Sequence, residues 1–178
     1  MHDALKRTIF IFIVAFAAMS YGHAQPKTLG ATFSLSGAGL TYEHYLNEES
    51  YINADIKAEM LSHFIDRNDR PGISASVSCN FILKRWTTRY GNSVHAFAGP
   101  GVIVGYAHDF LKDRGYLFGL KGRIGIDCLF DRNVSISACV TPVLGSHAVL
   151  RDDYIEMKYY RSGLISTILP EIGIKYTF

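Results

Sequence analysis

The sequence predicts an all-β fold, an eight-stranded antiparallel up-and-down transmembrane β-barrel, and three observations lead to it. Segments in which apolar and polar residues alternate recur along the chain, and this period of two is typical of strands with two unlike faces. The chain has 16 glycines but only 5 prolines, a composition typical of many short strands and turns. After residue 24, no apolar stretch reaches the roughly 18 residues that indicate a membrane helix. Strands are therefore the expected means of crossing a membrane.

Residues 1–24 are predicted to be a signal peptide, which leaves residues 25–178 as one barrel domain. A basic pair, Lys6-Arg7, precedes the apolar run from Ile9 to Ala18, and Gly22-His23-Ala24 offers small residues at a cleavage site. A retained spanning helix is the alternative, but the apolar run is about half of the roughly 20 residues that such a helix needs. The remaining length suits one domain of about 100 to 200 residues.

The first two predicted strands are short. They run from Leu29 to Ser36 and from Leu40 to Leu46, and Gly37 to Gly39 joins them. One long bent strand over the same residues is the alternative. Two strands are preferred because an even number returns both chain ends to the same side of the membrane.

The third predicted strand, Ile52 to Met60, has the clearest alternation. Its even-numbered residues are apolar, whereas its odd-numbered residues are polar or charged. A slip of one residue would turn three charges, including Lys57, toward the surroundings of the apolar face. If those surroundings are lipid, a basic charge near the midplane costs about 2 to 4 kcal/mol. The register of this strand is therefore firmly specified.

Five further strands complete the predicted barrel. They share one apolar face and one face of polar or small residues, with Ile82 as an exception. Their ranges are Ile73 to Leu83, Val94 to Tyr106, Phe118 to Cys128, Val134 to Leu144 and Leu164 to Phe178.

The connections between these strands fall into two classes. Those on the side of the C-terminus are short: Asn47 to Ser50, Thr87 to Asn92 and Asp131 to Asn133. Those on the other side are longer: His63 to Gly72, Ala107 to Gly115 and Val149 to Gly163. Short periplasmic turns opposite longer external loops are typical of outer-membrane barrels, although the first connection is an exception.

Aromatic residues cluster near the predicted strand ends, where membrane interfaces favour them. Near the C-terminal side lie Tyr45, Tyr51, Trp86, Phe130, Tyr176 and Phe178. Near the opposite side lie Tyr106, Phe110, Tyr116 and Phe118. The alternative is that these rings belong to the core of a soluble sheet.

The polar faces carry charges of both signs, which predicts an ion-paired network inside a closed lumen. Its expected members are Glu43, Asp55, Lys57, Glu59, Lys84, His95, Lys121, Arg123, Asp127, Glu171 and Lys175. The alternative is a secreted soluble β-barrel that binds a small ligand and carries these charges on a solvated face. Glycines on the polar faces favour the crowded lumen, because a solvated face gains nothing from missing side chains.

Two segments carry a family resemblance, Gly39 to Leu46 and the alternating C-terminal run from Glu171 to Phe178. The chain resembles the small OmpA/OmpX-type outer-membrane β-barrels, particularly those of Bacteroidetes. The resemblance implies a monomer in the outer membrane of a Gram-negative cell, in contact with lipid and lipopolysaccharide. It also implies that Tyr176 and Phe178 form a signal for the barrel-assembly machinery. The external loops are shorter than in adhesive relatives, and no peptidoglycan-binding domain follows.

The resemblance implies a structural or surface-interaction role in the envelope, and it raises one enzymatic alternative. Some similar barrels hydrolyse lipid A with Ser, His and an acid. Ser146-His147 followed by Asp152-Asp153 is the only comparable cluster near the external rim. Adjacent strand residues point to opposite faces, and the His-x-Ser spacing of that family is absent. No catalysis is therefore expected.

Other functions find little support in the sequence. The mature charge is close to neutral, so no nucleic-acid partner is expected. The three cysteines, Cys79, Cys128 and Cys139, match no metal or redox spacing, the histidines are scattered, and Asp66 to Arg70 lacks spaced acidic ligands. No metal and no cofactor are expected. Eight strands also leave no room for a general pore.

Overall fold

The computed structural model describes residues 25–60, 71–109, 114–130, 133–151, 154–163 and 169–178. The predicted signal peptide, residues 1–24, lies outside this part of the chain. Ten strands follow one another: β1 (Lys27–Ser34), β2 (Gly37–Tyr45), β3 (Ser50–Glu59), β4 (Gly72–Thr87), β5 (Ser93–His108), β6 (Arg114–Leu129), β7 (Val134–Val140), β8 (Val143–Leu150), β9 (Ile155–Tyr159) and β10 (Glu171–Thr177).

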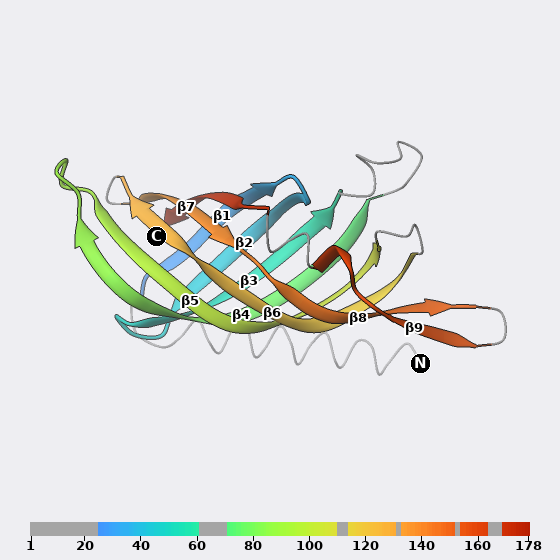
Figure 1. Ribbon diagram of the computed structural model, residues 1–178. Coiled ribbons are helices and arrows are strands. Elements are labelled where there is room, and N and C mark those ends of the chain that lie inside the picture. The colour runs from blue at the N-terminus through green and yellow to red at the C-terminus, as the bar shows by residue number, and fades with distance from the viewer. Residues whose placement is uncertain (1–24, 61–70, 110–113, 131–132, 152–153, 164–168) are drawn as a thin grey trace, which may run out of the picture.

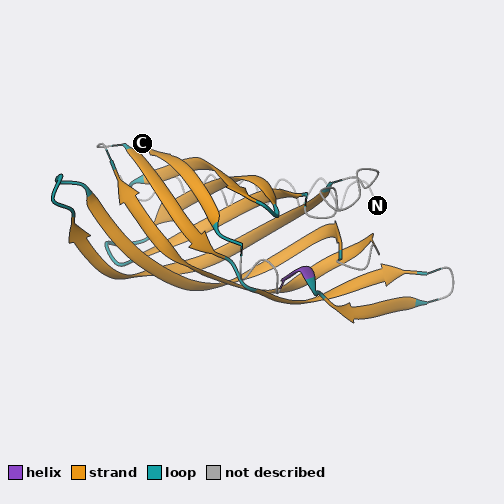
Figure 2. Cartoon of the chain, turned by 45° about the horizontal axis from the view of Figure 1, so that its top comes forward, coloured by secondary structure: helices purple, strands orange, loops and turns teal. Residues whose placement is uncertain are grey.

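These strands form one closed antiparallel barrel (Figures 1 and 2). From β1 to β6 each strand pairs with the next along the chain, and β10 closes the wall by pairing with both β1 and β7. Ten strands give an eight-stranded barrel because β7 and β8 follow one another along β6, while β9 and β10 are two parts of the last strand. The predicted eight-stranded antiparallel barrel is therefore confirmed.

The break between β7 and β8 has a local cause. Pro142 lies in the gap and has no N–H to donate to a neighbouring strand. Its carbonyl still accepts a hydrogen bond from the Gly122 N–H at 2.8 Å, so the two halves stay aligned along β6. The seventh barrel strand thus extends to Leu150, beyond the predicted end at Leu144.

The last barrel strand differs from the expectation. Residues 149–163 were predicted to be an external loop, but β8 ends within them and β9 lies in their middle, paired with β8. After β9 the chain leaves the wall, and β10 begins at Glu171 rather than at the predicted Leu164. The alternation of Ile155, Met157 and Tyr159 with polar neighbours is the signal that the loop prediction overlooked.

The first two strands are separate, as preferred from the sequence. Ser34 is paired with Gly37, so the turn between the two strands consists of Leu35 and Ser36. The predicted connection, Gly37 to Gly39, belongs to β2 instead. The N–H of Met60 donates to the carbonyl of Ser36 at 2.8 Å and ties this turn to the end of β3. The β1–β2 turn and the end of β3 therefore lie together at one rim of the barrel.

Burial in this barrel is the reverse of that in a water-soluble protein. Ile56, Val102, Ile126 and Ile174 lie on the outer surface and are 58%, 55%, 49% and 54% exposed. Arg123, in contrast, is 0% exposed in the lumen. The apolar side of each alternating strand therefore faces outward, and the charged side faces inward.

Exposed aromatic residues lie at both ends of the outer wall. Tyr106 and Tyr116 pack against each other at one end, with 5.1 Å between ring centroids, while Tyr176 and Phe178 are exposed at the other. Tyr45 and Tyr51 were expected among these rings, but Tyr51 is fully buried in the lumen and Tyr45 packs against it, so both assignments were wrong. The predicted position of Phe110 lies outside the described residues.

The two ends of the barrel hold different parts of the chain. The terminal end holds Phe178, whose N–H donates to the Lys27 carbonyl at 2.9 Å. The hairpin end holds the β8–β9 hairpin, which extends away from the terminal end in both ribbon views (Figures 1 and 2).

Candidate functional site

The lumen is the candidate site, and its centre is a cluster of four charged side chains from three strands. Glu43 of β2 accepts from Arg123 of β6 at 3.2 Å and from the Lys175 ammonium of β10, which lies 3.1 Å from each carboxylate oxygen. Lys175 also pairs with Asp127 of β6. Two carboxylates thus balance two cations, so that charges removed from water are paired.

Two more ion pairs continue the network toward the hairpin end. The Lys121 ammonium lies 2.8 Å from Asp55 Oδ2 and 2.9 Å from Ser76 Oγ. The Lys57 ammonium lies 3.3 Å from Glu171 Oε2 and donates to Ser36 Oγ at 2.8 Å. These contacts join strands that lie far apart around the wall, and therefore brace the barrel across its interior.

Uncharged side chains pack beside the central charged cluster. Tyr51, Phe97 and Cys139 form a buried cluster, and the Arg123 guanidinium lies over the Phe97 ring at 5.0 Å from its centroid. A cation over an aromatic face is electrostatically favourable. The lumen centre is therefore packed by rings as well as by ion pairs.

The structure brings together most of the residues expected in the network. Ten of them line the lumen: Glu43, Asp55, Lys57, Glu59, His95, Lys121, Arg123, Asp127, Glu171 and Lys175.

Lys84 does not join the network. The register of β4 shifts between Ile82 and Lys84, which turns the strand and leaves Lys84 exposed and paired with Ala96. Arg85, opposite His95, points to the lumen mouth in its place. The break in alternation at Ile82 was the sequence signal of this β-bulge.

The hairpin end of the lumen is packed differently, in a way that the sequence reading missed. Ile103, Leu117 and Val143 form a buried apolar cluster with Tyr160, which follows β9 and is only 5% exposed. His147 stacks on Tyr160, with 6.1 Å between ring centroids, and contacts the Ala107 carbonyl through Nε2 at 2.9 Å. The chain beyond β9 therefore packs into the lumen.

Asp109 holds this part of the chain in place. Its Oδ1 accepts hydrogen bonds from the Ser162 N–H at 2.9 Å and from the Ser162 hydroxyl at 3.0 Å, and both residues are buried. Residues 160–162 therefore close the lumen from the hairpin end with apolar packing and one anchored turn.

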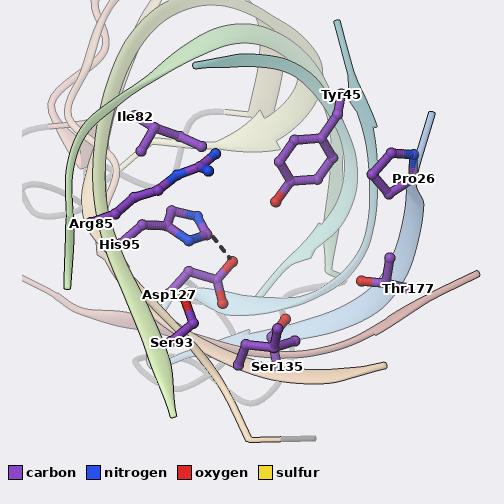
Figure 3. Close-up of a pocket in the computed structure, with 10 residues that line it drawn as sticks. Pro26, Tyr45, Ile82, Arg85, Ser93, His95, Asp127, Ser135 and Thr177 are labelled. Carbon is purple, nitrogen blue, oxygen red and sulfur yellow. Dashed lines mark ion pairs between the residues drawn. The ribbon is translucent and has the colours of Figure 1, made fainter. Parts of the chain in front are cut away.

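A cavity of about 280 Å³ opens at the terminal end of the lumen (Figure 3). Its floor includes His95 and Asp127, whose Nε2 and Oδ2 atoms lie 3.8 Å apart. The full lining is Pro26, Tyr45, Ile82, Arg85, Ser93, His95, Asp127, Leu129, Ser135 and Thr177. The cavity therefore reaches the charged cluster at Asp127.

Ser146 and His147, the candidate nucleophile and base, do not face each other. Ser146 lies on the outer face of β8 opposite Tyr159, while His147 points into the lumen and is fully buried. Asp152 and Asp153 lie outside the described residues. Ser36 does contact Lys57, but this ammonium pairs with Glu171 and, in that form, has donors only.

No metal centre is found in the described ranges, where no cluster of three or more His, Cys, Asp or Glu side chains is placed to bind an ion. The three cysteines are free thiols. No helix among the described residues is long and apolar enough to cross a bilayer.

Comparisons with known proteins give one structural similarity. No family model and no curated protein matches the chain. A solved structure described as a major outer membrane protein from Thermus thermophilus is similar with a TM-score of 0.45 and 10% sequence identity. The similarity covers 88% of this chain and 100% of that chain.

Proposed function

We propose that this chain is an outer-membrane β-barrel of a Gram-negative cell, with a closed polar lumen and a structural or surface-interaction role in the envelope. The observation that carries the proposal is the reversed burial of the barrel. Leu40, Leu120 and Leu144 are more than 60% exposed on the outer wall, while Arg123 and Lys175 are buried. A hydrocarbon environment outside the barrel accounts for both the exposed leucines and the buried basic side chains.

The free energies involved are large. Transfer of one Leu, Ile, Val or Phe side chain from water to an apolar environment contributes about 1.5 to 3 kcal/mol. Soluble monomers rarely expose a contiguous apolar patch larger than a few hundred Å². A continuous belt of such residues around the wall therefore favours insertion in lipid over exposure to water.

A soluble barrel with a ligand in its interior is the weaker alternative. Its interior would be expected to be apolar and hollow, whereas ion pairs and rings occupy this lumen. The cavity at the terminal end does not change this, because the buried charged cluster forms its floor.

The proposal includes neither conduction nor catalysis. The lumen is packed near its centre by the charged cluster and toward the hairpin end by Tyr160 and its apolar neighbours. The expected partners are membrane lipid and lipopolysaccharide, with the barrel-assembly machinery during insertion. Tyr176 and Phe178 are proposed as part of the assembly signal, and one chain makes the whole barrel.

The proposal is tested on purified protein. In detergent, the chain should give the circular dichroism spectrum of a β-protein and migrate differently on gels before and after heating. A chain that stays soluble without detergent would contradict insertion.

Two further assays separate the alternatives. Incubation with lipopolysaccharide, followed by mass measurement of lipid A, should show no loss of acyl chains, and a loss would favour the deacylase. Liposomes that contain the protein should swell no faster than liposomes without it, and faster swelling would favour a pore.

A further inference from the structure

The β8–β9 hairpin extends beyond the barrel wall at the hairpin end. β8 is paired with β6 as far as Ala148, which lies opposite Tyr116, and then continues to Leu150, which pairs with Ile155 of β9. Figure 1 shows this hairpin reaching past the ends of β5 and β6. The hairpin is therefore a two-stranded ribbon, and within the described part of the chain β8 is the strand that pairs it with the wall.

The outer face of this ribbon is apolar. Leu150, Tyr154, Ile155 and Met157 are 64%, 61%, 65% and 61% exposed. A lipid belt explains apolar residues as far as the tyrosines at the strand ends. Met157 is paired with Ala148 and so lies level with Tyr116, but Leu150 and Ile155 lie beyond that tyrosine, at the tip of the ribbon. An apolar surface outside the membrane indicates a docking surface.

The far edge of β9 offers backbone hydrogen bonds to a partner. Among the described residues, β9 pairs with β8 on one side and with no strand on the other. The Tyr160 N–H donates toward β8, to the Gly145 carbonyl at 2.9 Å. Because backbone direction alternates along a strand, the N–H and C=O groups of Ile155, Met157 and Tyr159 point to the open edge.

The sequence of β9 is complementary to itself. In an antiparallel pair centred on Met157, Ile155 lies opposite Tyr159 and Glu156 lies opposite Lys158 of the other copy, twice each. A shift by two residues would place Glu156 against Glu156, or Lys158 against Lys158. Within one chain Glu156 already pairs with Lys158, with 3.0 Å between Oε1 and Nζ, so in the dimer each of these charges would lie beside two opposite charges. Opposite charges across a strand pair stabilise it and like charges destabilise it, so charge favours the register centred on Met157 over registers shifted by two residues.

We propose that β9 pairs with β9 of a second copy of this chain, in antiparallel orientation about Met157. The apolar faces of the two ribbons then join into one surface, on which the Ile155 and Tyr159 side chains of the two copies pack together. The edge is closed in the same step, which removes the tendency of an open strand to pair with unrelated chains.

The geometry sets how the two barrels are related. The twofold axis of an antiparallel strand pair is perpendicular to the sheet, and this ribbon continues the barrel wall. The two barrels therefore point in opposite directions and meet at their hairpin ends. In cells this would join two facing outer membranes, a step that rests on the proposed function, whereas the pairing itself does not.

The contact is expected to be weak, because one strand pair buries much less surface than a stable interface of about 1,200 to 2,000 Å². The purified full chain should form a dimer in detergent that increases with protein concentration. This dimer differs from the monomer expected from the sequence. Light scattering on eluted protein over a range of concentrations measures it, and a monomer at every concentration would overturn the proposal.

Charge reversal provides the sharper test. Glu156→Lys alone and Lys158→Glu alone each place like charges opposite each other twice, and each should weaken dimer formation roughly tenfold. A mixture of the two variants restores opposite charges and should form heterodimers as well as the native chain forms dimers. If the mixture is as weak as the single variants, β9 is not the paired strand in this register.

Backbone pairing is tested at Met157. Met157→Pro removes an N–H that points to the open edge and leaves the bonds to β8 in place, so dimers should be lost. Met157→Leu is the matched control and should dimerise normally. Heat-dependent migration on gels shows in each case that the barrel has folded, so failure of the membrane proposal is seen separately from failure of the pairing.

Discussion

The two halves of the lumen differ in the cluster that each contains. Toward the terminal end, Glu43, Arg123, Asp127 and Lys175 form a charged cluster that links three strands. Toward the hairpin end, Ile103, Leu117 and Val143 pack with Tyr160 in an apolar cluster. The charged half is specified by alternation along the strands, whereas the apolar half depends on a segment that leaves the wall.

The contrast between the two clusters indicates which part of the lumen tolerates substitution. Charges in the first half are almost completely buried, so each depends on its partner. The second half depends on burial and shape, which tolerate volume-conserving changes. Loss of one charged partner should therefore cost more than loss of one apolar side chain.

The largest effect is expected at Arg123. Arg123→Met keeps most of the volume but removes one of the two cations that pair with Glu43 among the described residues, and breaking a buried pair costs about 3 to 5 kcal/mol. The free energy of unfolding is measured by urea titration in detergent, with the gel shift as readout. Arg123→Lys, which keeps a cation, should lose less, and equal losses would show that the charge does not matter.

A slightly smaller loss is expected in the apolar half. Leu117→Ala removes buried volume beside Tyr160 and should lower the free energy of unfolding by about 2 to 4 kcal/mol. Leu117→Met, close in volume, should lose less than about 1.5 kcal/mol. A loss at Leu117→Ala that exceeds the loss at Arg123→Met would reverse the order of the two halves.

The outer wall provides a third comparison. Ile126→Lys places a cation on the outward face of β6 and should lower the free energy of unfolding in bilayers by about 2 to 4 kcal/mol if the residue lies near the midplane. Lys84→Ala is the control, because Lys84 lies near a strand end and is exposed. An outer wall in contact with water would tolerate the lysine at almost no cost.

The smallest effect is expected at the lumen mouth. Arg85 is exposed, and its side chain reaches the Glu48 carbonyl in a surface turn. Arg85→Gln should therefore change the free energy of unfolding by less than about 0.5 kcal/mol. A change as large as that at Arg123 would mean that the mouth belongs to the charged cluster.

The strands of the barrel wall and the charged residues of the lumen could be predicted from the sequence for the same reason. Each strand alternates with a period of two, so the face of a residue such as Asp55 or Lys121 follows from its neighbours. Lys84 was placed on the wrong side because a β-bulge shifts the register, and only Ile82 signalled it. The sequence left one strand or two open between Leu29 and Leu46, and the pairing of β1 with β2 decides for two.

The apolar half could not be predicted in the same way. Tyr160 follows a strand of five residues that lies within a long connection, and its burial depends on contacts with Ile103 and Leu117, which are distant in sequence. Alternation gives the face of a residue within a strand but not the path of a chain that leaves the sheet. Tyr51 was misplaced for a related reason, because an aromatic ring fits both an interface and a packed lumen.

The central claim is that hydrocarbon surrounds the outward residues, and fluorescence quenching tests it most directly. The chain has one tryptophan, Trp86, so Trp86→Phe combined with Ile126→Trp places a single reporter on the outward face of β6. In bilayers with brominated acyl chains, strong quenching is predicted, with little quenching by aqueous acrylamide. Strong quenching by acrylamide and none by the brominated lipid would contradict the account.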